Sequence, residues 1–379
     1  MELLATGASA PFEAVSSVCQ DTDERLWAVI WQKGQVLRST GQAWTPLAAK
    51  DGWDVAYTRC VAADPQGGVW IGTQYAGLYH WQNGAVTESL SSANGLPSGR
   101  INALLASASG ELWIGTGLAE DQQHFLQRRK AGQLRTFNLP PGSGPVVALA
   151  VDAAGDCWAA TSRELLLRVR QDVLTDETGN TLPGAGAIRC LLGTPDGSLW
   201  IGYGGQGLGR LKAGHFSQCR TGQGLPDDFI SNILPDGFGR LWCAGNRGIF
   251  SVRAKDLDDL AEGRAMRVRA VVYGRNDGLP GLQASSDSWP GAMRGTDGRL
   301  LFAMQSGVAV VYADNFKENP NPPPVLIEQV TVNARQRRLT GRAGLRRHPL
   351  LPRRSSCAMA ECTCACHPAS GAWSLLSRR

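Results

Sequence analysis

A tryptophan that returns at a nearly constant interval is the feature that most constrains this chain. Trp27, Trp70, Trp113, Trp158, Trp200 and Trp242 each follow an apolar residue or a cysteine, at spacings of 43, 43, 45, 42 and 42 residues. A second marker, the pair Leu-Pro, keeps this period at Leu96-Pro97, Leu139-Pro140, Leu182-Pro183 and Leu225-Pro226. Two markers in register indicate internal repeats, and a period of about 40–45 residues is typical of β-propeller blades.

Each repeat is predicted to contain four short strands. An apolar strand such as Ile101–Leu105 leads through an Asp/Gly turn into the tryptophan strand. A third strand follows a Gly-apolar pair and ends in a hairpin signal such as Asn83-Gly84, and a ragged polar strand forms the outer edge. We therefore expect an all-β fold, a β-propeller with seven four-stranded blades over residues 15–316.

The seventh repeat is degenerate. Leu301 stands where a tryptophan is expected, 59 residues after Trp242, because residues 254–269 form an insertion. The insertion is predicted to be helical at Lys255–Leu260.

The motifs within one repeat resemble a known family. Trp70-Ile71-Gly72-Thr73, then Gly77-Leu78 and Asn94-Gly95-Leu96-Pro97-Ser98, are similar to the repeat of the two-component regulator propellers. These propellers form the extracytoplasmic sensor part of bacterial hybrid histidine kinases. The segment Pro322–Asn333 resembles the first strand of the three-Y β-sandwich that follows the propeller in this family.

The resemblance implies a function. It implies a non-catalytic sensor, a fragment of a signalling receptor, that binds a small polar ligand or glycan fragment in the periplasm. It also implies a homodimer through the sandwich domain of a full-length relative. Residues 317–334 are accordingly interpreted as a linker and a truncated sandwich strand.

Residues 335–379 are interpreted as a disordered, aberrant tail. They carry ten arginines and one acid, so the chain's net charge of +5 leaves residues 1–334 at −4. A mildly acidic propeller argues against a nucleic-acid partner. Cys362, Cys364, Cys366 and His367 lack the two distant ligand pairs of a zinc site, so we expect no metal and no cofactor.

The remaining composition bears on location and redox chemistry. No apolar run reaches the roughly 18 residues of a membrane helix, and Met1–Ala5 lacks the basic start of a signal peptide. The sequence as given is therefore expected to stay cytoplasmic, in contrast to the periplasmic sensors it resembles. The six cysteines before the tail lie among apolar neighbours and are predicted to be buried thiols.

A binding face can be predicted from the repeat. The loops after the second and fourth strands of a four-stranded meander emerge at one end of the ring, and they carry aromatic, amide and charged groups suited to polar ligands. The candidate ligand-binding residues are Trp53, Tyr75, Arg100, Tyr203, Asp228, Asn246, Arg247 and Trp289.

Two other functions remain open. An enzyme like the streptogramin lyases, which share similar blades, would need a histidine and an acid in the central mouth. None of the five histidines is placed for such a site, so no catalytic residue is predicted. The third alternative is a scaffold that binds protein partners.

Overall fold

The computed structural model divides the chain into two compact units, Met1–Phe316 and Lys317–Arg379. In the first unit it describes residues 2–4, 13–40, 43–55, 57–117, 124–181, 186–279, 281–286 and 288–315. In the second unit it describes residues 329–332 and 335–338.

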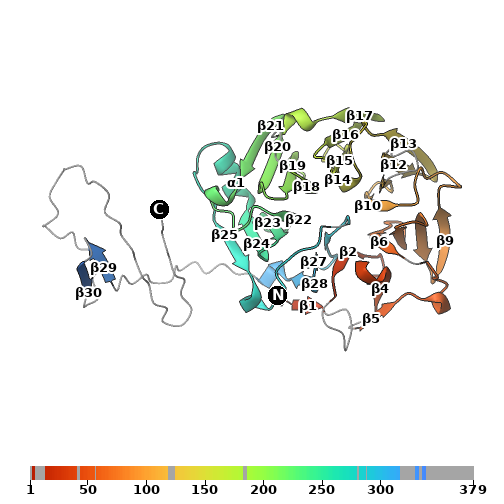
Figure 1. The fold of residues 1–379 in the computed structure, drawn as a ribbon, viewed down its shortest axis with the longest axis horizontal. Coiled ribbons are helices and arrows are strands. Elements are labelled where there is room, and N and C mark those ends of the chain that lie inside the picture. The colour runs from red at the N-terminus through yellow and green to blue at the C-terminus, as the bar shows by residue number, and fades with distance from the viewer. Residues whose placement is uncertain are drawn as a thin grey trace. The chain divides into compact units, whose positions relative to one another are not determined.

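Seven antiparallel four-stranded sheets form a ring, which confirms the seven-bladed β-propeller (Figure 1). In blades 1 to 6 the first strand in sequence is innermost, and the fourth lies at the rim. The strands of blades 1 to 3 are β2 (Val15–Gln20), β3 (Leu26–Ile30), β4 (Gln35–Thr40), β5 (Ala43–Pro46), β6 (Thr58–Ala63), β7 (Val69–Thr73), β8 (Leu78–Gln82), β9 (Ala85–Leu90), β10 (Ile101–Ala106), β11 (Leu112–Thr116), β12 (Phe125–Lys130) and β13 (Gln133–Asn138).

Blades 4 to 6 repeat this order with one insertion. Their strands are β14 (Val146–Val151), β15 (Cys157–Thr161), β16 (Leu166–Arg170), β17 (Val173–Asp176), β18 (Ile188–Gly193), β19 (Ser198–Tyr203), β20 (Leu208–Lys212), β21 (His215–Cys219), β22 (Ile230–Pro235), β23 (Arg240–Gly245), β24 (Ile249–Arg253) and β25 (Ala270–Tyr273). The helix α1 (Ala254–Ala261) confirms the predicted helical insertion, and its Leu257 packs into the core. Short 3₁₀ turns occupy Trp31–Lys33, Ala49–Asp51, Thr178–Asn180, Thr221–Gln223, Arg275–Asp277 and Ala313–Asn315.

Blade 7 is completed by the start of the chain. Its inner strands are β26 (Ala292–Arg294), β27 (Leu300–Met304) and β28 (Gly307–Val311), and β1 (Glu2–Leu4) pairs with β28 as the fourth. The register places Leu3 opposite Ala309. The sequence placed the start of the propeller at residue 15, but the ring begins earlier because a strand from its N-terminal end closes it.

The repeated tryptophans are core residues with a shared polar anchor. In four blades the indole Nε1 donates a hydrogen bond of 2.8–3.0 Å to an aspartate six residues earlier, in the turn between the first and second strands. The four aspartates are Asp21, Asp64, Asp152 and Asp236. Blade 3 has Ser107 at this position, and Trp113 Nε1 is buried without a hydrogen-bond partner among the described residues. The anchor therefore belongs to a turn-and-strand unit that most blades share.

The six cysteines of the propeller are buried and free, as the sequence predicted. Burial raises the pKa of Cys60 to about 12, so this thiol stays protonated at neutral pH. The same holds for Cys219, whose pKa burial also raises to about 12.

The second unit contains one described antiparallel pair, β29 (Gln329–Val332) with β30 (Arg335–Arg338). β29 falls within the segment interpreted as a sandwich strand. β30 falls within the tail interpreted as disordered, so four residues of that tail are extended and paired with β29. The candidate metal residues Cys362, Cys364, Cys366 and His367 lie outside the described residues.

Candidate ligand-binding face

The ring has two different ends. Turns between the first and second strands, and between the third and fourth, share one end, which we call the lower end. Loops between the second and third strands, and the connections from one blade to the next, share the other, which we call the upper end.

Six inner strands carry a β-bulge at the same place near the upper end. The pairing register shifts across the second residue of β2, β6, β10, β14, β18 and β22. The bulged residues are Ser16, Arg59, Asn102, Val147, Arg189 and Ser231. A bulge re-aims a side chain out of the regular ladder and is enriched beside functional sites. The same bulge recurs in six blades while its residue type varies. The side chains at these positions can therefore differ in charge and polarity without any change in the fold.

Two exposed tyrosines stand at the upper end of blade 2. Tyr57 is 60% exposed and Tyr75 is 73% exposed, and their rings meet edge to face with centroids 5.6 Å apart. A fold of this size usually buries such rings, and exposed aromatic pairs provide flat surfaces for stacking. We call Tyr57 and Tyr75 the tyrosine platform.

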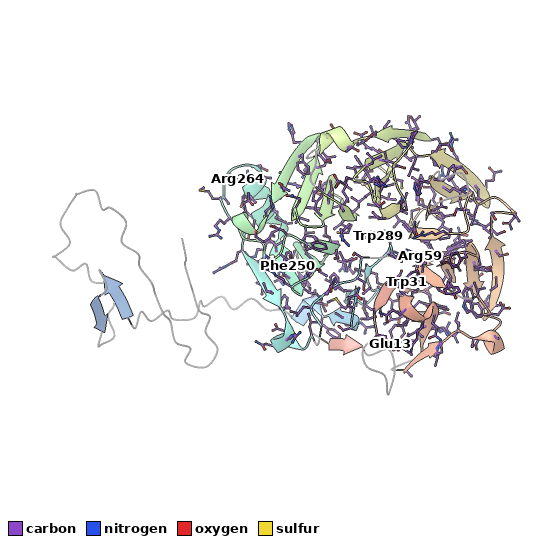
Figure 2. All side chains as sticks on the ribbon, in the orientation of Figure 1. Glu13, Trp31, Arg59, Phe250, Arg264 and Trp289 are labelled. Atoms are coloured by element: carbon purple, nitrogen blue, oxygen red, sulfur yellow. The ribbon has the colours of Figure 1, made fainter. Side chains whose placement is uncertain are left out.

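A buried cation lies close to the platform in sequence and structure. The guanidinium of Arg59, two residues after Tyr57, lies 4.5 Å above the Trp31 ring and donates a hydrogen bond of 2.5 Å to Gln74 Oε1. Arg59 is only 7% exposed, so the stacked ring and the amide fix its position. Figure 2 shows Arg59 and Trp31 side by side on the inner side of blades 1 and 2.

The backbone at Tyr57 is strained. Its φ of +61° lies in the left-handed region, which a bulky residue rarely adopts. Two hydrogen bonds hold it there, from Gln74 N to Tyr57 O at 2.8 Å and from Thr58 N to Gly34 O at 3.1 Å. Strain of this kind costs about 1–3 kcal/mol and clusters at functional sites.

The loop before blade 3 packs tightly against the platform loop. Gly77 N donates to Gly99 O at 2.9 Å, and a Cβ on Gly99 would lie 2.2 Å from the carbonyl oxygen of Tyr75. The next residue, Arg100, donates from Nε to Asn102 Oδ1 at 3.3 Å. Tyr75 and Arg100, both predicted from the sequence, are therefore brought to neighbouring loops.

The centre of the ring is crossed by the long connection between β25 and β26. Trp289 forms a parallel bridge with Ala103 of blade 3, and its carbonyl oxygen accepts a hydrogen bond from Leu104 N at 3.0 Å. Asn232 of blade 6 donates to Ser285 O at 3.0 Å, so the segment is anchored on both sides of the axis. Figure 1 shows this blue-green segment crossing the ring towards β10, and Figure 2 shows Trp289 at the centre.

Two predicted binding residues are packed inside the protein, and a third is partly buried. Trp53 is 4% exposed and lies between Tyr79 and Trp81, with ring centroids 5.6 and 6.3 Å away. Tyr203 is 1% exposed in the core of blade 5. Trp289 is partly buried against the cores of blades 3 to 6. The rings of Trp53 and Tyr203 therefore serve packing, whereas Trp289 stays a predicted contact residue at the centre of the ring.

The other three predicted residues form a separate group at blades 5 and 6. Asp228 accepts hydrogen bonds from Thr221 N and Oγ1 at 2.7 and 3.0 Å. The backbone N–H groups of Asn246 and Arg247 both donate to Asp227 Oδ2, leaving their side chains exposed. None of these three residues is aromatic, unlike those of the tyrosine platform, but the partly buried Phe229 follows Asp228 and lies 4.6 Å from the Arg189 guanidinium.

The described histidines are separated from one another in the ring. His80, His124 and His215 lie in blades 2, 3 and 5, and no cluster of three potential metal ligands occurs among the residues that the structure describes. Burial lowers the pKa of His80, although the nearby Asp64 carboxylate opposes this shift. Burial likewise lowers the pKa of His124.

Comparisons with known proteins agree with the fold and the repeat. The two component regulator propeller family matches residues 95–117, which confirms the resemblance drawn from the repeat. No protein with curated annotation matches the sequence. No helix within the described ranges is both long and apolar enough to cross a membrane.

Solved structures extend the likeness to the whole ring. The extracellular domain of the hybrid two-component system BT3049 from B. thetaiotaomicron matches with a TM-score of 0.64 and 19% identity over 90% of this chain. The corresponding domain of BT4673 matches with a TM-score of 0.59 and 14% identity over 88% of this chain. This chain spans 44% and 45% of those two chains. A streptogramin B lyase is also similar, with a TM-score of 0.61 and 15% identity. The match covers 80% of this chain and 95% of the lyase. The chain therefore shares its fold with sensor propellers and with lyase propellers.

Sequence reasoning missed Tyr57, Arg59, Gln74 and Trp31. Tyr57 and Arg59 flank the start of a strand that was read as a core element, and the bulge that displaces Arg59 leaves no mark in a single sequence. The usable signal was the position of Tyr57 at the end of an inter-blade connection, at the same end of the ring as Tyr75.

Proposed function

We propose that this propeller is a non-catalytic sensor module of a bacterial two-component receptor and that it binds a small polar ligand, such as a glycan fragment, at the tyrosine platform. The observation that carries the proposal is the exposed Tyr57–Tyr75 pair, held by strained backbone beside the fixed cation of Arg59. Aromatic rings stack on sugar faces, and Gln74, Arg59 and Arg100 supply hydrogen-bonding groups nearby.

The proposed setting follows from the resemblance. The similar sensor domains are extracellular, so we place the working propeller outside the cytoplasm as the sensing part of a membrane receptor. Homodimerisation through a complete sandwich domain is part of the same proposal.

A thermal-shift screen against oligosaccharides tests it. A ligand that binds only the folded state raises the melting temperature, by about 5 °C at 100 times its Kd for a domain of this size. Tyr75→Ala should abolish the shift and leave the unliganded Tm unchanged, because Tyr75 is exposed. Absence of stabilisation by every oligosaccharide would count against the glycan proposal.

A lyase is the second candidate, favoured by the match that covers 95% of a streptogramin B lyase. Against it, residues 281–286 and 288–291 lie across the axis where a central catalytic mouth would open. Turnover of a cyclic ester antibiotic by the purified chain would establish the lyase and displace the sensor proposal.

A further inference from the structure

One position on the third strand recurs as an arginine over the repeated tryptophan. Arg38, Arg128, Arg168 and Arg210 each pair in register with the tryptophan of their own blade. Their guanidinium carbons lie 5.9, 5.7, 4.8 and 5.3 Å from the indole centroids, in the same order. The repeat thus supplies four copies of one cationic position at the lower end of the ring.

Three of these four arginines have a carboxylate partner. Arg128 pairs with Asp172 at 2.7 Å, Arg168 with Asp156 at 2.5 Å, and Arg210 with Asp258 at 2.7 Å. Arg38 makes no ion pair with any described residue, and its buried Nε has no hydrogen-bond partner among them. Among the four arginines at this repeated position, Arg38 is the one without an ion pair to a described acid.

Only Arg128 takes its acid from the hairpin of the next blade, because Arg168 pairs within its own blade and Arg210 pairs with an aspartate of α1. Asp172 is the second residue of the Gln171-Asp172 turn after β16, and it reaches back to Arg128 in the preceding blade. The equivalent turn after β8, facing blade 1, is Asn83-Gly84. Both turns have positive φ at both positions, 47° and 64° in the first and 53° and 85° in the second. Gly84 therefore takes the place of Asp172 in the same backbone geometry but brings no carboxylate.

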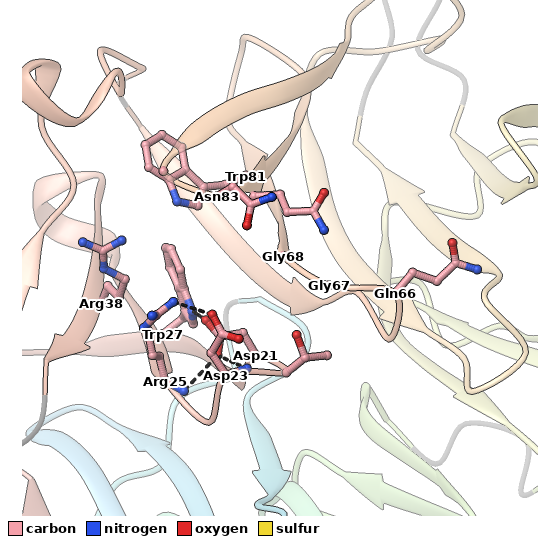
Figure 3. A pocket seen from close by; sticks show the side chains of 13 residues that line it. Asp21, Asp23, Arg25, Trp27, Arg38, Gln66, Gly67, Gly68, Trp81 and Asn83 are labelled. Carbon is pink, nitrogen blue, oxygen red and sulfur yellow. Dashed lines mark hydrogen bonds and ion pairs between the residues drawn. The ribbon is translucent and has the colours of Figure 1, made fainter.

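A cavity of about 640 Å³ lies at this site, between blades 1 and 2. Figure 3 shows Arg38 and Trp27 on one wall and Trp81, Asn83 and Gly68 on the other. The acids in the lining are already engaged, because Asp21 Oδ2 accepts the hydrogen bond of Trp27 and Asp23 pairs with Arg25 at 2.6 Å. Arg38 is the cation left without an acid among the described lining residues, and the amides of Gln66, Gln82 and Asn83 surround the same space.

We propose that this cavity binds a small hydroxylated carboxylate, whose carboxylate group pairs with Arg38 in the place that Asp172 takes against Arg128. A guanidinium fork matches the planar carboxylate in two parallel hydrogen bonds. The amides and the backbone around Gly67 and Gly68 are suited to the ligand's hydroxyl groups. This site is at the opposite end of the ring from the tyrosine platform and does not depend on it.

Calorimetric titration with sodium D-glucuronate tests the proposal, with D-glucose as the probe that lacks the carboxylate, at constant ionic strength. Wild-type protein should bind glucuronate in preference to glucose. Gly84→Asp should weaken glucuronate binding about tenfold or more, because the new carboxylate occupies Arg38. Gly84→Asn, its uncharged match, should bind within about threefold of wild type. Asp and Asn tolerate this left-handed turn position, where a Cβ meets no atom within 4 Å.

Two further variants locate the binding. Arg38→Gln should weaken glucuronate binding as Gly84→Asp does. Arg128→Gln, which changes the matched position at the junction of blades 3 and 4, should keep it. The proposal is overturned if wild-type protein does not distinguish glucuronate from glucose, or if Gly84→Asp binds glucuronate as Gly84→Asn does. Retention of glucuronate binding in Arg38→Gln would also overturn it, by placing the carboxylate outside this cavity.

Discussion

At the junction of blades 3 and 4, Arg128 lies over Trp113 and is neutralised by Asp172, which also pairs with Arg135 at 2.8 Å. At the junction of blades 1 and 2, the same arginine position meets Gly84, and a cavity remains. The upper end of blade 2 also differs from the junction of blades 3 and 4, because it carries two exposed tyrosines. One repeat thus yields a junction where the arginine pairs with an acid and a junction where it has no described acid. The first junction still leaves Trp113 Nε1 and Arg128 Nε without a hydrogen-bond partner among the described residues.

The largest effect is expected from the aspartate anchor in blade 4. Asp152 accepts hydrogen bonds from Trp158 Nε1 at 2.9 Å and from the N–H groups of Ala154 and Asp156. Asp152→Ala should lower the free energy of unfolding by about 3 kcal/mol, because buried donors lose a charged acceptor. Urea unfolding measures it, with Asp152→Asn as the milder variant that retains an acceptor for the turn. Equal stability of the alanine variant and wild type would contradict the anchor.

The two arginines give the direct contrast between junctions. Arg128→Gln should cost about 1 kcal/mol of unfolding free energy, because it removes a partly buried ion pair with Asp172. Arg38→Gln should change stability by less than about 0.5 kcal/mol, since no ion pair is lost. Chemical denaturation of both variants makes the comparison, and a larger loss for Arg38→Gln would reverse our interpretation of the two junctions.

Blade 3 offers a gain of stability. Ser107→Asp should give the buried Trp113 Nε1 the partner that four other blades possess, stabilising the protein by about 0.5–1 kcal/mol. Ser109→Asp, two residues along the same turn, serves as the control for added charge. If both variants shift the urea midpoint equally, the effect is electrostatic and the anchor is not transferable between blades.

The smallest effect concerns acid pH in blade 5. Burial would raise the pKa of Asp196, but hydrogen bonds from Lys212, Thr194 and Ser198 outweigh it and hold the pKa well below its usual value. A depressed pKa in the folded state means that the unfolded state binds more protons, so this stability is present above about pH 4 and is lost as the pH falls further. Asp196→Asn should flatten the dependence of Tm on pH between about pH 2 and 4. An unchanged slope would exclude Asp196 as a contributor.

The periodic part of the fold could be predicted from the sequence because each blade buries the same pattern. The tryptophan register located the second strands, and Leu301 was correctly assigned to a degenerate seventh blade. The three-residue strand β1 could not be found, because its pairing with β28 is non-local and its sequence is too short for a pattern. The course of the β25–β26 connection across the axis could not be predicted for the same reason. Its serine-rich sequence is typical of a surface loop, and its partners in blades 3 and 6 are distant in the sequence.

The site was predicted only in part. The upper end was derived from topology, and Tyr75 and Arg100 do lie there together. Aromatic type alone does not distinguish Trp53 and Tyr203, which pack inside, from Tyr75, which is exposed. Gly84 was read as a hairpin residue, and its importance appears only when its place is compared with that of Asp172.

We propose that ligand recognition at the upper end is concentrated on blade 2. It is tested most directly by measuring the Tm shift caused by a stabilising oligosaccharide in Tyr75→Ala and in Arg247→Ala, which alters the separate group at blades 5 and 6. We predict that the shift disappears in Tyr75→Ala and is unchanged in Arg247→Ala. A shift that persists in Tyr75→Ala and disappears in Arg247→Ala would instead place ligand recognition at blades 5 and 6.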